Sequence, residues 1–181
     1  MQQYYKVLAA DLTHNGLRYK LGLNVDVNEF NDKECQNGLH FADEKQLAKW
    51  LDYGTHLAFI SIPPDARTVH FADKSKADRI VIDKIITLAD WDMWDDPIFC
   101  MSIVQQNGES LKYVKEQTPE ICLAAVLQNG YALKHVREQT DEICIAAVRQ
   151  NGFALKHVRE QTPKICITAV ARNGFALKYV Q

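Results

Sequence analysis

Residues 118–139 read TPEICLAAVLQNGYALKHVREQ, and residues 140–161 repeat this phrase as TDEICIAAVRQNGFALKHVREQ. Two further copies read DPIFCMSIVQQNGESLKYVKEQ at 96–117 and TPKICITAVARNGFALKYVQ at 162–181. No residue is inserted between copies, so equivalent positions recur with a strict period of 22. Such a period indicates stacked supersecondary units, each of which buries its apolar face against its neighbours. The copies therefore predict an all-α solenoid of four 22-residue αα-hairpin repeats over residues 91–181.

One copy contains the signals for two helices. Thr118 is an N-cap candidate, and Pro119 suits the first helical position. We expect Gly130 to end this helix in the left-handed conformation and Tyr131–Val136 to form a shorter second helix. The predicted apolar stripe of the first helix consists of Ile121, Cys122, Ala125 and Val126.

Four of the five cysteines occupy one repeat position. Stacked helices lie roughly 10 Å apart, whereas a disulfide needs Cα atoms within about 7 Å. The sequence has no CxxC pair and no close Cys/His spacing, so it predicts no metal site. We therefore expect the repeat cysteines to fill the core without pairing, and Cys35 receives no assignment. The repeat cysteines are Cys100, Cys122, Cys144 and Cys166.

Basic and aromatic residues form periodic rows that we expect to face solvent. One interpretation is a ladder that binds an acidic or phosphorylated protein partner; the other is a solvated face with local ion pairs, which contribute little energy. Aromatic and arginine side chains dominate interface energetics. Phe175 lies in the last copy, so a further hypothesis is that the protein self-associates through the C-terminal repeat end. The partner-binding candidates are Lys134, His135, Arg137, Lys156, His157 and Arg159, with Tyr131, Phe153 and Phe175 beside them.

Residues 1–90 do not repeat and predict a small α+β domain. Asn15-Gly16 predicts a turn between two strands, and Asp43 is a predicted N-cap for a helix over 43–53. A helical or turn segment is expected over 72–78. The predicted strands are Tyr4–Ala10, a second strand ending at Leu21, Leu39–Phe41, Leu57–Ile62, Thr68–Phe71 and Arg79–Ile86.

Composition excludes several classes of protein. The 181-residue chain has a net charge of −2, and neither half has the basic excess of a nucleic-acid binder. No apolar run approaches the roughly 18–20 residues of a membrane span, and the N-terminus lacks the layout of a signal peptide. We expect a cytoplasmic protein, in the host cytoplasm or the virion if the protein is viral.

Two resemblances cover most of the chain. The pattern TPEICLAAVxQNGxALKxV in 118–136 and 140–158 resembles a family of short helical repeats known as a domain of unknown function, common in giant viruses. The segments HNGLRYKLGLN (14–24), NGLHFAD (37–43), YGTHLAFISIPPDA (53–66) and KADRIVIDKI (76–85) resemble the domain that precedes repeats in giant-virus ankyrin-repeat proteins. These resemblances imply a modular viral protein and supply no activity.

A shorter resemblance concerns residues 38–43, GLHFAD, which are similar to the GxYFAD segment of ADP-ribosyltransferases. It implies that NAD is a cofactor, that His14 holds the ribose, that His40 stacks on nicotinamide and that Asp78 activates the substrate. His40 stands where the family has Tyr, Asp78 stands where it has Glu, and Asn15 separates His14 from the following glycine. The alternative is that the histidines are turn and strand residues and that Asp78 pairs with Arg79.

The sequence contains no phosphate-binding loop, dinucleotide fingerprint, HExxH or GxSxG motif. The preferred interpretation is a scaffold or protein–protein interaction module without a cofactor. An enzyme of the ADP-ribosyltransferase type, or an inactive relative of one, is the alternative.

Overall fold

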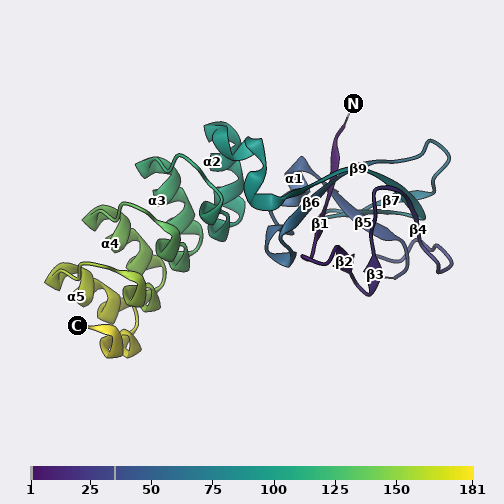
Figure 1. The fold of residues 1–181 in the computed structure, drawn as a ribbon. Helices are drawn as coiled ribbons and strands as arrows, with labels where there is room; N and C mark the ends of the chain where they lie inside the picture. The colour runs from purple at the N-terminus through teal and green to yellow at the C-terminus, as the bar shows by residue number, and fades with distance from the viewer. Residues whose placement is uncertain (1, 35) are drawn as a thin grey trace. The chain divides into compact units, whose positions relative to one another are not determined.

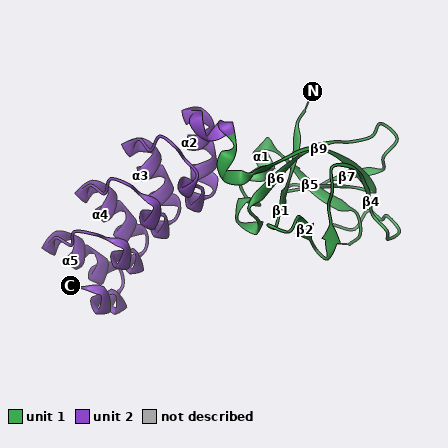
Figure 2. Ribbon diagram, viewed as in Figure 1, with its two compact units in different colours: residues 1–91 green, residues 92–181 purple. Residues whose placement is uncertain are grey.

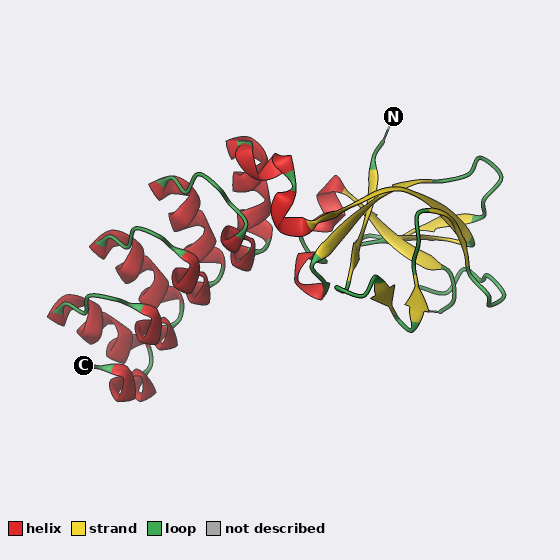
Figure 3. Cartoon of the chain, in the orientation of Figure 1, coloured by secondary structure: helices red, strands yellow, loops and turns green. Residues whose placement is uncertain are grey.

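The computed structural model describes residues 2–34 and 36–181, and Cys35 lies outside the described residues. The chain divides into two compact units, unit 1 over residues 1–91 and unit 2 over residues 92–181 (Figure 2). Unit 1 is built on a β-sheet, and unit 2 consists of helices and turns (Figure 3). The fold class predicted from the sequence is confirmed.

Unit 1 is a seven-stranded sheet in the order β4-β9-β6-β1-β5-β8-β7, in which every neighbouring pair is antiparallel. The central strand β1 has the sequence YYKVL and is buried over its last four residues. Figure 1 shows β6 and β5 on either side of it. The strands are β1 Tyr4–Leu8, β4 Gly22–Val25, β5 Leu39–Asp43, β6 His56–Ser61, β7 Thr68–His70, β8 Ser75–Ala77 and β9 Arg79–Thr87.

A separate short hairpin pairs β2 (Thr13–His14) with β3 (Leu17–Arg18). Asn15 and Gly16 connect them with φ of 51° and 77°, which confirms the predicted turn. Two positive φ angles in a row require residues that tolerate the left-handed region, and asparagine and glycine do so. The hairpin thereby fixes the place of His14.

The predicted helix over 43–53 is shorter in the structure. α1 spans Glu44–Leu47, and Asp43 and Gln46 form a reciprocal capping box at its start. The chain then tightens into a 3₁₀ turn, η1 (Leu51–Tyr53), because it must reach β6 through Gly54. A Cβ on Gly54 would lie 2.1 Å from the Leu8 carbonyl oxygen, so only glycine allows this approach.

The prediction of a helical or turn segment over 72–78 was wrong for its second half. Residues 75–77 form β8, a fully buried strand that pairs with β5 and β7. The tight turn before it is closed by the Phe71 N–H, which donates to the Lys74 carbonyl at 2.8 Å. Pairing with distant strands overrides local preference here, and the short strand β4 was missed for the same reason.

Unit 2 contains four α-helices that stack in chain order (Figure 1). Each begins at a side-chain cap, Asp96, Thr118, Thr140 or Thr162, which accepts a hydrogen bond from a backbone N–H of the first turn. A 3₁₀ helix follows each one. The α-helices are α2 Pro97–Gln106, α3 Pro119–Gln128, α4 Asp141–Gln150 and α5 Pro163–Arg172, and the 3₁₀ helices are η4 Gly108–Lys112, η5 Gly130–His135, η6 Gly152–His157 and η7 Gly174–Tyr179.

The second element of each repeat is therefore a 3₁₀ helix and not a second α-helix. Gly130, Leu133 and Val136 are buried at a spacing of three, which matches three residues per 3₁₀ turn. The Asn129 side chain caps this turn by accepting from the Tyr131 N–H at 3.0 Å.

The expected left-handed conformation of Gly130 was wrong, since positive φ occurs at Gly16, Gly22 and Gly38 among the described glycines. A Cβ on Gly130 would lie 2.6 Å from the carbonyl oxygen of Ala147 in the next repeat. The glycine is therefore required by the close approach of successive repeats.

Glutamine side chains connect successive repeats. The Gln139 amide donates to the carbonyls of Leu133 and His157 at 3.2 and 2.9 Å, and its oxygen accepts from the Arg159 N–H at 3.0 Å. Gln117 and Gln161 make the equivalent bonds one repeat before and one repeat after. The same glutamine hydrogen bonds thus recur every 22 residues and pair backbone groups at the contact between successive repeats.

The prediction that the repeat cysteines fill the core is confirmed for Cys100, Cys122 and Cys144, whereas Cys166 in the last copy is partly exposed. All four are unpaired thiols, and three of them are buried. Burial raises the pKa of Cys100 and of Cys144 to about 11, so these thiols stay protonated and unreactive. Before the first repeat, the 3₁₀ turn η3 (Asp92–Asp95) stacks Trp94 on Tyr113 with ring centroids 5.1 Å apart.

Candidate functional site

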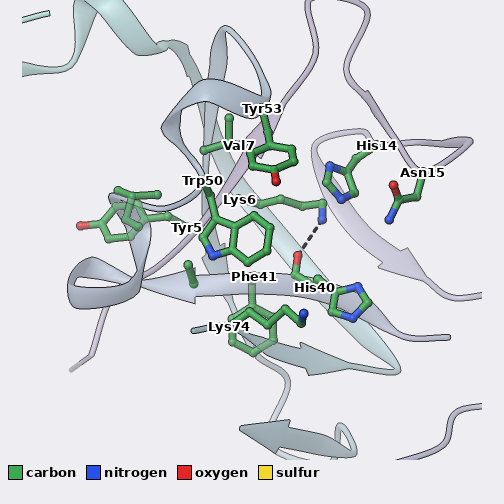
Figure 4. A pocket seen from close by; sticks show the side chains of 12 residues that line it. Tyr5, Lys6, Val7, His14, Asn15, His40, Phe41, Trp50, Tyr53 and Lys74 are labelled. Carbon is green, nitrogen blue, oxygen red and sulfur yellow. Dashed lines mark hydrogen bonds between the residues drawn. The ribbon is translucent and has the colours of Figure 1, made fainter. Parts of the chain in front are cut away.

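Unit 1 contains a cavity of about 220 Å³ beside the central strand β1 (Figure 4). β1 contributes Lys6, β5 contributes His40 and Phe41, and the β2–β3 hairpin contributes His14. Trp50 forms part of the wall from the segment after α1. With Lys74 from the turn before β8, the cavity brings together side chains from five separate segments of the chain.

Lys6 is the most unusual residue in this cavity. Its side chain is buried in the middle of the central strand, with 4% of the residue exposed. Its Nζ donates to the His40 carbonyl oxygen at 2.6 Å and lies 4.7 Å from the centre of the Tyr19 ring. Burial lowers the pKa of Lys6 to about 7, because the charged ammonium loses its hydration.

Two imidazoles lie near Lys6. Burial, reinforced by the charges of Lys6 and His40, lowers the pKa of His14 to about 4. Burial also lowers the pKa of His40, although the hydrogen bond between its Nε2 and the Glu34 carbonyl, 3.0 Å long, opposes the shift. Both rings are therefore neutral near pH 7 and can donate or accept a hydrogen bond.

The opposite wall of the cavity is aromatic. The Trp50 and Tyr53 rings lie with their centroids 5.2 Å apart, and the Trp50 Nε1–H donates to the Asp73 carbonyl at 2.8 Å. The Lys74 ammonium lies 5.6 Å from the Trp50 ring centre and 3.3 Å from a carboxylate oxygen of Glu34. The wall is thus held by hydrogen bonds and ring contacts and offers an apolar aromatic surface.

Asp78 does not line this cavity. Its carboxylate lies 3.2 Å from Nε of Arg67 and 3.9 Å from Nε of Arg79, so it ties the start of β9 to the preceding loop. The structure therefore brings His14 and His40 together but places Asp78 elsewhere, in the local pairing with Arg79 that was the alternative interpretation.

In unit 2, lysine and aromatic side chains of successive 3₁₀ helices contact one another in a row, which we call the lysine–aromatic ladder. It consists of Tyr131, Phe153, Lys156, His157, Lys178 and Tyr179. Lys156 Nζ lies 4.8 Å from the Tyr131 ring centre, and Lys178 Nζ lies 5.7 Å from that of Phe153. His157 packs edge-on against Tyr131, and Tyr179 packs edge-on against Phe153. Each repeat thereby holds a lysine of the next repeat in a fixed place.

The first repeat departs from this ladder. Glu109 occupies the position of Tyr131, and its carboxylate lies 2.7 Å from Lys134 Nζ and 3.1 Å from His135 Nε2. Lys134 is thus neutralised within the protein, whereas Lys156 and Lys178 face aromatic rings.

Arg137 and Arg159 occupy a different environment from the lysines. The Arg159 guanidinium donates to the carbonyls of Arg137 and Val136 at 2.6 and 2.9 Å. Arg137 makes the equivalent bonds to Lys115 and Val114 at 2.5 and 3.0 Å. Both arginines therefore connect a repeat to the one before it.

Comparison with known proteins places both units in families. The model of a domain of unknown function, DUF7666, matches residues 2–93, and that of a second one, DUF4116, matches residues 96–140 and again 118–162. The chain belongs to the DUF7666 family. Unit 1 is its DUF7666 domain, and unit 2 carries the DUF4116 repeats.

Three relatives come from Acanthamoeba polyphaga mimivirus. Uncharacterized protein R869 is 32% identical over 121 residues, which are 62% of this chain and 88% of R869. R868 is named as an ankyrin repeat protein and is 31% identical over 87 residues, 46% of this chain and 43% of R868. R896, also named as an ankyrin repeat protein, is 29% identical over 133 residues, 62% of this chain and 40% of R896. The chain thus spans about two fifths of R868 and R896. No solved structure matches the chain.

Sequence reasoning missed Lys6 in the DUF7666 domain. A signal was present, because a lysine stands between two tyrosines and Val7-Leu8 in a strand whose other residues are apolar or aromatic. A lone lysine in such a strand is commonly placed on a solvated face. The burial of Lys6 depends on residues from distant segments, including His14 and Tyr19, that cover this face of the sheet.

Within the described residues, no group of three or more His, Cys, Asp or Glu side chains could hold a metal ion. None of the helices formed by residues 2–34 and 36–181 is long and apolar enough to cross a membrane.

Proposed function

We propose that the DUF4116 repeats form a protein-interaction module whose lysine–aromatic ladder binds an acidic segment of a partner protein. The observation that carries the proposal is that Lys156 and Lys178 are exposed yet held by aromatic rings. A pre-positioned side chain loses little conformational entropy on binding. Since the relatives R868 and R869 come from a mimivirus, we further propose that the protein acts in the cytoplasm of an infected cell or in the virion.

The proposed contact residues are Lys156, His157 and Lys178 of the ladder. Lys134 and His135 of the preceding copy extend this row, with Glu109 paired to both of them. Burial lowers the pKa of His157, with Lys156 and Lys134 contributing, so this ring acts as a neutral hydrogen-bonding group. Arg137 and Arg159 contribute by holding the repeats in register, since their N–H groups are engaged by carbonyls.

The test is quantitative affinity purification from the native cell with the wild type and with a Lys156→Glu/Lys178→Glu variant. Reversal of two charges at a rigid cationic edge should lower recovery of the direct partner by about tenfold or more. The matched control is Lys20→Glu/Lys49→Glu, which makes the same charge change on the DUF7666 domain. Unchanged recovery of every partner by the ladder variant, with its helical circular dichroism intact, would reject the proposal.

Self-association through the face of the last repeat is a second proposal. Leu155 is fully buried between repeats, whereas Leu177 at the equivalent position is 63% exposed and Phe175 is 79% exposed. A second copy could cover this apolar face. Light scattering should then give a dimer that Leu177→Glu converts to a monomer, and a wild-type monomer at high concentration would contradict the proposal.

The ADP-ribosyltransferase alternative is supported by one observation, that His14 and His40 line one cavity. Two observations oppose it. Asp78 lies outside the cavity, and the nicotinamide ring of NAD⁺ carries a positive charge that Lys6 and Lys74 disfavour. A rise in melting temperature on addition of NAD would support the alternative, and no rise at a millimolar concentration would remove it.

A further inference from the structure

We propose that the cavity beside Lys6 binds a small molecule composed of one flat apolar ring and one carboxylate group. This site lies in the DUF7666 domain and goes beyond the interaction role of the repeats. The proposal rests on the size of the cavity, on its charge and on its aromatic wall.

The cavity has the size of a single ring with one substituent. Its volume is about 220 Å³. An apolar cavity of about 150 Å³ holds benzene. The remaining space accommodates one acid group beside the ring.

The charge of the cavity selects an anion. None of the described residues that line it is acidic, whereas Lys6 and Lys74 are basic. Lys74 is paired with Glu34, so Lys6 is the buried cation without a carboxylate partner. An ammonium has three N–H donors, and the described residues supply one hydrogen-bond acceptor to Lys6, the His40 carbonyl.

A carboxylate oxygen next to Lys6 would supply the missing acceptor and neutralise the buried charge. A charge-assisted hydrogen bond of this kind is about twice as strong as a neutral one. A phosphate dianion would bring two charges against this single unpaired cation, so a monoanion fits better.

The aromatic wall of the cavity favours a ligand that contains a ring. Trp50 and Phe41 face the space beside Lys6, and Tyr53 stands at the rim (Figure 4). Lys6 extends between these rings and the two imidazoles, with its amine on the side of His40. Stacked or edge-on ring pairs attract each other beyond the effect of burying their apolar area. A ligand ring against the aromatic wall thus places its carboxylate toward Lys6.

Binding should take up a proton near neutral pH. The titratable groups that face Lys6 are His14, His40 and Tyr19, and Lys74 and Lys76, in and just before β8, act on His40. Burial raises the pKa of Tyr19, and both histidines have lowered pKa values, so these three groups stay neutral. A bound carboxylate raises the pKa of Lys6 from about 7. Affinity is then highest below pH 7 and falls as the pH rises above it.

The experiment is isothermal titration calorimetry of the full chain with benzoate and with benzamide, two probes of equal size that differ in charge. At pH 6 benzoate should bind at least about tenfold more tightly than benzamide. The affinity for benzoate should fall about fivefold or more at pH 8.5, and that for benzamide should stay constant.

Three variants complete the test. Lys6→Met keeps the length of the side chain and should remove the preference for benzoate while benzamide binding is kept within about twofold. Lys84→Met, an exposed site elsewhere on the domain, should bind both probes as the wild type does. Trp50→Leu should weaken both probes to the same extent, because the ring contact is lost and the charge is kept.

The proposal is overturned if neither probe binds at about 10 mM, or if benzamide binds the wild type as tightly as benzoate. It is also overturned if a folded Lys6→Met protein binds benzoate as the wild type does. Should Lys6→Met fail to fold, the comparison of benzoate with benzamide at the two pH values in the wild type decides the question.

Discussion

Two polar side chains, the partly buried Gln139 of unit 2 and the buried Lys6 of unit 1, are paired to different extents. In unit 2 a partly buried amide such as that of Gln139 meets two carbonyls and one N–H, and the same bonds recur at Gln117 and Gln161. In unit 1 the amine of Lys6 is buried with one carbonyl and one aromatic ring. The repeats pair these glutamines because each copy supplies the partners of the next. Lys6 lacks such partners among the described residues, unlike the buried Lys76 of the same unit, whose amine donates to the carbonyls of Lys33, Gln36 and Asn37.

This contrast separates structural from functional residues. The fixed positions of the repeats, namely the caps, cysteines, glycines and glutamines, are explained by stacking. A buried cation in a cavity is costly and is not explained by packing alone. We therefore look for chemistry in unit 1 and for binding at the exposed edge of unit 2.

The largest effect expected in the repeats comes from glycine. Gly152→Ala should lower the free energy of unfolding by about 2–3 kcal/mol, because the new Cβ overpacks against the next repeat. A Cβ there would lie 2.6 Å from the Ala169 carbonyl oxygen, whereas nothing lies within 4 Å of a Cβ on Gly174. Urea unfolding followed by helical circular dichroism measures both variants.

Gly174→Ala is the matched control, with the same substitution at the same repeat position, and should change stability by less than about 0.5 kcal/mol. Equal effects at Gly152 and Gly174 would contradict the assignment of this glycine to the contact between repeats.

In unit 1, Lys6→Met should change how stability depends on pH. The folded-state pKa of Lys6 is lowered from 10.5 to about 7, so the penalty for burying the charge is fully present below pH 7. The penalty disappears as the pH rises toward 10.5, where the unfolded state also loses its proton. Near pH 6.5 the variant should be more stable than the wild type by several kcal/mol, with an upper limit of about 5 kcal/mol, since each pKa unit corresponds to about 1.4 kcal/mol.

The difference between the two proteins should shrink toward pH 10, as measured by urea unfolding at a series of pH values. A difference that is independent of pH would show that Lys6 keeps its charge in the folded state.

Arg159→Lys should lower the free energy of unfolding by about 1–2 kcal/mol, since a lysine cannot donate to two carbonyls in the planar geometry of a guanidinium. The comparison variant is Lys156→Gln, which removes a ladder charge and should cost less than about 0.5 kcal/mol. If Arg159→Lys has no effect on stability, Arg159 is free to act in partner binding.

The smallest change in stability is expected at Ser110, a fully buried hydroxyl of the first copy that lacks a hydrogen-bond partner among the described residues. The later copies have alanine at this position. Ser110→Ala should raise the free energy of unfolding by about 1 kcal/mol, because an unpaired hydroxyl is removed. A loss of stability in thermal unfolding would indicate an ordered water or another partner at this hydroxyl.

The sequence predicted the parts of the fold that local signals determine. The 22-residue period, the threonine caps and the Asn15-Gly16 turn are all confirmed. The role of Gly130, the strand at Ser75–Ala77 and the burial of Lys6 were not predictable, since each depends on a contact with a distant segment. Sequence reasoning therefore identified two histidines of the site in unit 1, His14 and His40, but not Lys6.

The central claim is that Lys6 is a buried amine with a lowered pKa beside a cavity of the DUF7666 domain. Titration of the Lys6 side chain by NMR, with isotope-labelled lysine and Lys6→Met for assignment, tests this claim most directly. The account predicts a midpoint of about 7 for the pKa of Lys6. A midpoint near the ordinary value of 10.5 would contradict it, because the amine would then be hydrated or paired with an acid.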